Sequence, residues 1–293
     1  MERNTCKWLC IAVVAFLIAA AASHLATTNT SLLKAYDGPK IVFEDKDAEI
    51  RGKPAAPPGK PPSDQPNPSV DKWAVVIGIS DYQGVANDLR YCDDDARDMY
   101  NYLLAKGYPK GNIKLLLDKK ATAKAIISAI DWLNSWEGLN SEVVFFYSGH
   151  GSTYDGYNDG DNEYRDEAIV STDLYLILDG QLRQKFSTFS SQKISFTFDS
   201  CFSGGMDDLQ GSGRVVVAAC GETQYSWDGT SDQQNGVFTY YFVGTPSAGL
   251  QTYGTVEGAF AYAEPLARDF VLQQYNAPMD PQMYDQYAGD WTF

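Results

Sequence analysis

The chain has 293 residues, of which 44% are apolar and 21% charged, and its net charge is −15. This composition is too apolar for a disordered chain, and the length allows one large α/β domain or two small ones. The acidic excess repels phosphate backbones, which argues against a nucleic-acid partner and favours cations or cationic substrates. Of the two histidines, His24 lies in an apolar leader and only His150 in the body, so a zinc site of several imidazoles is excluded.

The first 70 residues form three segments without a core of their own. Basic residues precede an apolar run from Trp8 to Ala22, so residues 1–22 are predicted to be a cleaved secretory signal or an N-terminal anchor. Either alternative places the rest of the chain outside the cytoplasm. Residues 23–52 are predicted to be a stalk, a pro-segment or one edge strand, and the proline-rich residues 53–70 a semi-rigid linker. The folded domain is predicted over residues 71–293.

Four apolar runs of strand length alternate with helical patterns in this domain. A helix with Asp93–Asp95 in its first turn follows the first strand, and Thr122 is the predicted cap of a second helix. Strands that alternate with helices form βαβ units, so we expect an α/β fold of three layers, with a mostly parallel sheet and helices on both faces. The predicted strands are Trp73–Ile79, Ile113–Leu117, Val143–Tyr147 and Ile194–Phe198.

Two candidate catalytic residues follow the third and fourth strands directly. His150 stands in Ser-Gly-His-Gly and Cys201 in Asp-Ser-Cys. Alone, such a cysteine is usually an apolar filler and such a histidine a turn residue. Ligands of open α/β sheets bind beyond the carboxyl ends of the strands, so neighbouring strands would bring thiol and imidazole face to face. The thiolate is then a nucleophile, His150 its proton acceptor, and the amides of Gly151 and Cys201 are candidate donors to an oxyanion.

These motifs carry a resemblance to a known family. Residues 147–151 (Tyr-Ser-Gly-His-Gly) and 199–205 (Asp-Ser-Cys-Phe-Ser-Gly-Gly) resemble the dyad motifs of caspase-like cysteine peptidases, in the metacaspase branch and of the prokaryotic type. The resemblance covers most of residues 72–275. It implies a caspase-hemoglobinase fold, a dyad of Cys201 and His150, and cleavage of proteins or peptides after Arg or Lys, commonly with calcium activation. The caspase pattern Gln-Ala-Cys-x-Gly is absent, which argues against cleavage after aspartate, and Phe202 stands where many metacaspases have histidine.

Acidic residues near the nucleophile support the same specificity. A basic side chain that loses water requires a carboxylate partner, and Asp199 lies two residues before Cys201. By resemblance, Asp95 is a second acid of the substrate pocket; its alternative role is a stabilising charge at a helix N-terminus. Self-processing is predicted after Lys53, Lys60 or Arg214.

Calcium is the predicted cofactor. By resemblance to metacaspases, its ligands are Asp166, Asp179 and Asp208, whose oxygens suit a hard cation. The family's pair of adjacent acids is here Asp179-Gly180, so one carboxylate is missing. An acidic loop after His150 adds carboxylates at Asp159, Asp161 and Glu163, and its alternative role is a solvated loop.

Two other functions stay open at this point. The first is a caspase-like module without turnover that binds partners in a calcium-dependent way. The second is a legumain-like or gingipain-like dyad peptidase, which a preference for cleavage after asparagine would identify. The sequence leaves the oligomeric state and the physiological substrate open, and it allows membrane contact only through an N-terminal anchor.

Overall fold

The computed structural model describes residues 33–45, 65–156 and 163–293. The predicted leader lies outside the described residues, as do Lys53 and Lys60 and the loop residues Asp159 and Asp161. No helix within the described residues is long and apolar enough to cross a membrane.

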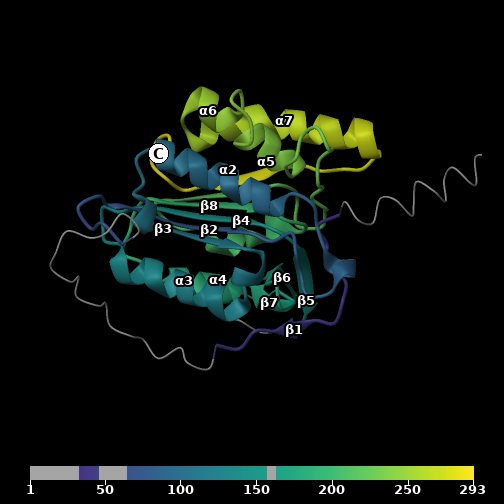
Figure 1. Ribbon diagram of the computed structural model, residues 1–293, viewed down its shortest axis with the longest axis horizontal. Helices are drawn as coiled ribbons and strands as arrows, with labels where there is room; N and C mark the ends of the chain where they lie inside the picture. Colours follow the sequence, from purple (N-terminus) through teal and green to yellow (C-terminus); the bar gives the residue numbers. More distant parts are fainter. Residues whose placement is uncertain (1–32, 46–64, 157–162) are drawn as a thin grey trace, which may run out of the picture.

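A six-stranded sheet forms the centre of the molecule, in the order β10-β9-β8-β4-β2-β3 (Figure 1). Neighbouring strands are parallel except β10, which runs antiparallel to β9. The four strands predicted from the sequence are all present, each within one residue of its predicted ends, and the mostly parallel sheet is confirmed. The strands are β2 (Lys72–Gly78), β3 (Ile113–Leu117), β4 (Glu142–Ser148), β8 (Ile194–Asp199), β9 (Arg214–Ala218) and β10 (Gln282–Asp285).

Helices cover both faces of this sheet (Figure 1). One face carries α2 (Cys92–Ala105), α5 (Val237–Phe242), α6 (Gly249–Tyr253) and α7 (Val256–Tyr275), and the other carries α3 (Ala123–Trp136) and α4 (Asp179–Phe186). A separate apolar cluster fills the space on each face. The three-layer α/β fold is therefore confirmed. Short 3-10 turns complete the chain: η2 (Val85–Asn87), η3 (Lys110–Asn112), η4 (Asp118–Lys120) and η5 (Ser203–Leu209).

The two predicted helices form as their sequences indicate. The Thr122 side chain accepts a hydrogen bond from the Ala125 amide at 3.2 Å, which caps α3 at the predicted residue. In α2 the acidic residues occupy the first turn, where they stabilise the helix dipole, but the buried face includes Asp95 while Leu104 is 36% exposed. A carboxylate buried in the first turn of a helix needs hydrogen-bond partners, and Asp95 finds them in Ser148, Asn235 and Gly236.

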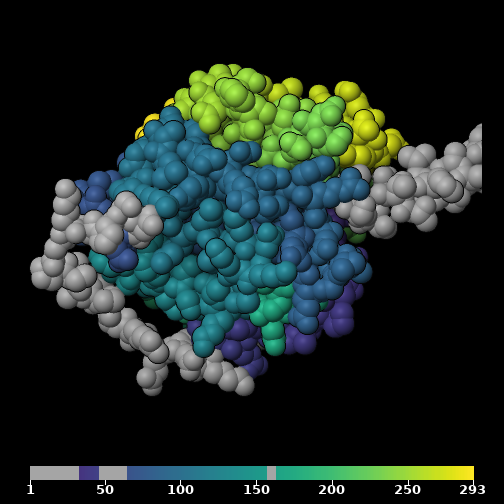
Figure 2. All heavy atoms as spheres, in the orientation of Figure 1, coloured from purple at the N-terminus to yellow at the C-terminus, as the bar shows by residue number. Residues whose placement is uncertain are grey.

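A second, smaller sheet of four strands lies beside α3 and α4, in the order β1-β7-β6-β5. Its strands are β1 (Ile41–Val42), β5 (Gly151–Asp155), β6 (Arg165–Val170) and β7 (Tyr175–Leu178). β1 is an edge strand, parallel to β7, and belongs to the stretch for which the sequence left three alternatives. In Figure 2 the segment 33–45 runs in purple along the lower edge of the molecule, so this stretch packs on the domain.

Candidate active site

The predicted dyad residues, His150 and Cys201, lie beyond the carboxyl ends of two neighbouring strands of the central sheet. Strands β4 and β8 are parallel neighbours in which Ser148 pairs with Asp199, and His150 and Cys201 each lie two residues further on. The backbones beyond the strands stay close, because a Cβ placed on Gly151 would come within 1.9 Å of the Cys201 carbonyl oxygen. Only glycine fits at position 151, which explains the bare backbone next to the histidine.

The imidazole of His150 is oriented by two groups from the segment after β2. Its Nε2 lies 2.7 Å from the Asn87 carbonyl oxygen, and its backbone amide donates to the Tyr82 hydroxyl at 2.7 Å. A carbonyl oxygen only accepts, so Nε2 carries the proton and Nδ1 of the neutral ring is the base. Burial lowers the pKa of His150, with the backbone groups of Asn87 and Lys34 acting in the opposite direction. The ring is therefore neutral and able to take a proton at neutral pH.

The thiol of Cys201 is fully buried and turned toward Ser226. Its Sγ receives a hydrogen bond from the Ser226 amide at 3.3 Å and donates to the Ser226 carbonyl at 3.5 Å. Burial raises the pKa of this thiol well above its usual value, so it is protonated in the conformation described. Nδ1 of His150 has no hydrogen-bond partner of good geometry among the described residues. The two side chains share one edge of the sheet, and attack requires Sγ to turn from Ser226 toward the imidazole.

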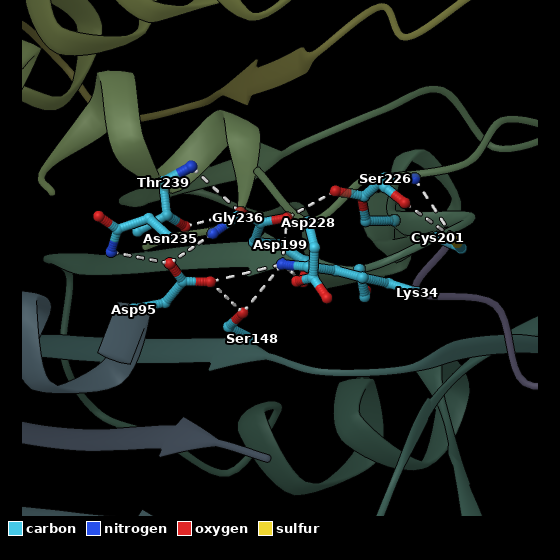
Figure 3. A network of polar contacts seen from close by, with 12 residues as sticks. Lys34, Asp95, Ser148, Asp199, Cys201, Ser226, Asp228, Asn235, Gly236 and Thr239 are labelled. Atoms are coloured by element: carbon cyan, nitrogen blue, oxygen red, sulfur yellow. Dashed lines mark hydrogen bonds and ion pairs between the residues drawn. The ribbon is translucent and has the colours of Figure 1, made fainter. Parts of the chain in front are cut away.

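The two predicted pocket acids, Asp95 and Asp199, converge on the side chain of Lys34 (Figure 3). The Lys34 Nζ lies 2.9 Å from Asp199 Oδ1 and 3.4 Å from Asp95 Oδ2, and donates to Ser148 Oγ at 3.1 Å. All three ionisable side chains are fully buried. The site thus holds a basic side chain, supplied by the chain itself, between the two carboxylates expected to bind one.

Further residues of this pocket were not predicted from the sequence. Polar groups hold the carboxylates in place: Asp95 accepts from Ser148, Asn235 and Gly236, and Asp199 from Ser226 and Thr239. The Gly236 backbone packs directly against the Lys34 side chain and Asp199, because a Cβ at this position would lie 2.4 Å from the Lys34 Nζ and 2.5 Å from Asp199 Oδ2. Ser226, Asn235 and Gly236 lie in loops without a periodic pattern, while Ser148 ends β4 and Thr239 lies in α5, so no single local signal marks the set.

Electrostatics in the pocket favour a bound cation. Burial lowers the pKa of Lys34, but neighbouring charges, Asp199 foremost, outweigh it and hold that pKa well above its usual value. Although burial raises the pKa of Asp199, the Lys34 charge and the hydrogen bonds outweigh it, and the net shift is downward. Burial raises the pKa of Asp95 to about 7 and that of Asp228, which also faces Lys34, to about 6. The pocket therefore stabilises an ammonium or guanidinium group, and without such a group the charged form of its carboxylates is destabilised by burial.

The backbone of residues 33–36 crosses this site in an extended conformation. The Lys34 carbonyl accepts from the Gly151 amide at 2.7 Å, and the Lys34 amide donates to the Ser226 carbonyl at 3.2 Å. On either side, Ala35 forms a parallel bridge with Gly151 and Leu33 an antiparallel bridge with Trp227. Of the two predicted oxyanion donors, the Gly151 amide thus bonds a peptide carbonyl, while no such contact is found for the Cys201 amide among the described residues.

Arg214, one of the predicted self-processing sites, is the first residue of β9 and pairs with Ile194 of β8. Its guanidinium donates to the Leu209 and Phe186 carbonyls. A peptidase takes an extended chain that is free to pair, so the prediction for Arg214 is wrong for the folded protein. The other two predicted sites, Lys53 and Lys60, lie outside the described residues.

The three predicted calcium ligands lie on elements that contact one another. Asp166 is in β6, Asp179 begins α4 and Asp208 is in η5, where it pairs with Arg183 at 3.3 Å. Within residues 33–45, 65–156 and 163–293, no group of three or more His, Cys, Asp or Glu side chains is arranged to hold a metal ion. Calcium binding by these three residues therefore stays a prediction.

Glu167 is an acidic residue of this region that the sequence did not single out. Burial raises its pKa to about 9, and the charges of Asp179 and Glu222 add to the shift. Neither carboxylate oxygen has a hydrogen-bond partner among the described residues, and a Cβ on Gly205 would lie 2.0 Å from Oε2. Gly205 follows Cys201 by four residues, so the Glu167 carboxylate packs closely against the loop after the nucleophile.

Comparison with known proteins places the chain in a family. Residues 71–260 match the caspase domain family. Metacaspase-3 of Arabidopsis thaliana is 26% identical over 256 residues, which cover 78% of this chain and 70% of that protein. Metacaspase-1 of Candida albicans is 34% identical over 160 residues (49% and 35%), and Metacaspase-4 of Arabidopsis thaliana 34% over 145 residues (47% and 34%). The chain therefore spans only about a third of the length of the latter two relatives.

A solved structure supports the same fold. The crystal structure of a Geobacter sulfurreducens protein aligns with a TM-score of 0.55 at 17% identity and covers 76% of this chain and 97% of its own. The relatives named here are fungal and plant metacaspases, so the prokaryotic type stays a prediction. The match to residues 71–260 shows that the chain belongs to the caspase domain family, and the metacaspases named above are among its relatives.

Proposed function

We propose that this protein is a cysteine endopeptidase that cleaves proteins after Arg or Lys, with Cys201 as nucleophile and His150 as general base. The observation that carries the specificity is the Lys34 ammonium, held 2.9 Å from Asp199 and 3.4 Å from Asp95. A pocket that a chain fills with its own buried lysine is chemically matched to basic side chains of other chains.

In the proposed reaction the substrate backbone follows the path of residues 33–36. Nδ1 of His150 takes the thiol proton, and the Cys201 sulfur attacks the carbonyl carbon of the basic residue. The Gly151 amide, which bonds the Lys34 carbonyl at 2.7 Å, stabilises the oxyanion. The imidazolium then protonates the leaving amine, and water hydrolyses the thioester.

The two alternative functions differ from this proposal in testable ways. A binding module without turnover needs no oriented base, yet His150 is held at both Nε2 and its backbone amide. A peptidase specific for asparagine needs neutral polar partners, whereas this pocket contains three buried acids, Asp95, Asp199 and Asp228. Both observations favour a peptidase of basic specificity.

We also propose calcium dependence and an extracytoplasmic location. The first is supported by the resemblance to metacaspases and by the crowding of Glu167 with Asp179, because a divalent cation would relieve repulsion between carboxylates. The second is supported by the apolar leader in residues 1–22.

A library of reporter peptides, assayed with the purified chain, tests the proposed function. We expect cleavage after Arg and Lys, loss of turnover in Cys201→Ala, and loss of the basic preference in Asp199→Ala. Cys92→Ala, which removes another buried thiol, is the matched control and should keep turnover. Cleavage mainly after Asn or Asp, or full turnover in Cys201→Ala, would contradict the proposal.

A further inference from the structure

The segment 33–36 occupies the active site as a substrate would, in its backbone as well as its side chain. Its amide and carbonyl groups pair with both walls: Lys34 donates to Ser226 and accepts from Gly151, and the Tyr36 amide donates to the Gly151 carbonyl at 2.9 Å. Strand addition of this kind is how peptidic ligands dock on exposed sheet edges. The contacts lie on both sides of one peptide bond, that between Lys34 and Ala35.

The same bond lies at the reactive groups. Ser226, which pairs with the Lys34 amide, is also the residue that contacts the Cys201 sulfur through its amide and carbonyl. Gly151, which binds the Lys34 carbonyl, is in backbone contact with Cys201. Lys34 is thus held at its amide by Ser226 and at its carbonyl by Gly151, both of which contact Cys201, and Figure 3 shows the Lys34 side chain reaching into the acid pocket.

From this placement we infer that the Lys34–Ala35 bond is cleaved by the protein's own active site, and that residues 33–36 block the site until then. The inference rests on the proposed function, because the same thiol and imidazole perform the cut. It names a bond that the sequence did not predict, since the predicted self-processing sites were Lys53, Lys60 and Arg214.

The reaction balances with groups already present and one water molecule. The Cys201 proton moves to His150 Nδ1, and the sulfur bonds to the Lys34 carbonyl carbon while the Gly151 amide holds the oxyanion. The carbon–nitrogen bond to Ala35 breaks as the imidazolium protonates that nitrogen, which leaves a thioester at Lys34. Water, losing a proton to His150, then displaces the sulfur and releases Lys34 as a carboxylate.

While residues 33–36 occupy the site, the Cys201 thiol is closed to other substrates. With the segment in place, Cys201 is fully buried and bonded to Ser226. Cleavage detaches the segment that ends at Lys34, while Ala35 remains connected to β1 and its pairing with β7. The cut therefore opens the acid pocket and leaves the strand on the other side of the bond in position.

Mass spectrometry and N-terminal sequencing of the full chain test the inference, with reporter peptides assayed in parallel. We expect the wild type to yield a product that begins at Ala35 and Cys201→Ala to remain uncut. Because the segment is already bound, the rate should be first order and independent of protein concentration. Lys34→Arg should be cut and Lys34→Gln should be cut at least about 100-fold more slowly, since the pocket requires a charge. Lys40→Gln is the matched control, because Lys40 lies in the same segment, is exposed and donates to the Thr153 carbonyl, away from the acid pocket.

The outcomes separate this inference from the proposed function. If reporters are cleaved while the Lys34–Ala35 bond stays intact, or if Lys34→Gln is processed at the wild-type rate, the inference is wrong and the proposed function stands. A rate proportional to protein concentration would overturn self-cleavage within one molecule. If neither the reporters nor the bond is cleaved, even by a chain that begins at Ala35, both are wrong.

Discussion

At the scale of single residues, Gly236 determines the size of the pocket. A methyl group here would lie 2.4 Å from the bound ammonium and 2.5 Å from Asp199 Oδ2, well inside van der Waals contact. We expect Gly236→Ala to lower kcat/KM for Arg and Lys reporters by at least about 100-fold, mainly through KM, because the side chain no longer reaches its carboxylates. Gly138→Ala, where the methyl group meets nothing within 4 Å, is the matched control. Unchanged kinetics in Gly236→Ala would place the basic residue elsewhere.

The pocket carboxylates also predict the pH dependence. With a cation bound, the pKa of Asp95 is raised to about 7 and that of Asp228 to about 6, and without it both lie higher, because Lys34 lowers them. Protonation as the pH falls removes the negative charge that binds the substrate, whereas His150, whose pKa lies below its usual 6.5, stays neutral in this range. Because kcat/KM reports the free enzyme, in which these carboxyl groups titrate above their cation-bound values, we expect kcat/KM for basic reporters to fall as the pH drops, with a midpoint above about 7.

A pH profile of Asp95→Asn measures this. The acid limb should move to lower pH in the variant, since one of the titrating groups is gone. If the wild type and Asp95→Asn lose activity with the same midpoint, the limb belongs to another group.

The sequence predicted which motif residues lie close together, but it did not indicate the residues that meet them only in the fold. His150, Cys201 and Asp199 follow buried apolar strands, and parallel neighbours bring such positions together. Lys34 is a single lysine in a polar stretch without periodicity, more than a hundred residues from Ser148 and Asp199, so nothing local indicates that it is fully buried. Its role follows only from the path of the backbone.

At the scale of elements, α4, β6 and η5 carry the predicted calcium ligands next to the loop after Cys201. We expect calcium to stimulate activity in the high micromolar to millimolar range, roughly that of extracellular modules. In Asp208→Ala the stimulation should be weakened by an order of magnitude or more. Asp232→Ala removes an exposed aspartate elsewhere and serves as the control.

A calcium titration of reporter cleavage checks this for the wild type and both variants. Full wild-type activity in chelator would end the calcium proposal. Unchanged calcium dependence in Asp208→Ala would shift the site to the acidic loop with Asp159 and Asp161.

The elements found and missed differ in their patterning. Apolar runs identified β2, β3, β4 and β8, and β9 had a comparable signal in Val215–Ala218 that the prediction did not use. β6 begins Arg165-Asp166-Glu167 and buries two of these charged residues, so its polar sequence does not indicate a strand. In α7, Pro265 interrupts a helical pattern that nevertheless continues to Tyr275.

At the scale of the whole molecule, the alternation of strands and helices in the sequence predicted the three layers, because a parallel sheet must be covered by helices on both faces. The sequence did not divide the strands between two sheets. β5 begins directly after His150, so the chain leaves the central sheet at the active site and builds the small sheet beside it. That departure creates the edge on which residues 33–36 lie.

The short connection between Lys34 and β1 has a kinetic consequence. β1 pairs with β7 a few residues beyond Lys34, so the lysine is tethered close to its own pocket. A ligand on so short a tether has an effective concentration of about millimolar, which a free peptide must exceed to displace it. Cutting after Lys34 places the lysine on the released side of the break, and dilution then prevents its return. One hydrolysed bond thereby makes the pocket's occupancy depend on the surrounding peptide concentration, and the change is irreversible for each molecule.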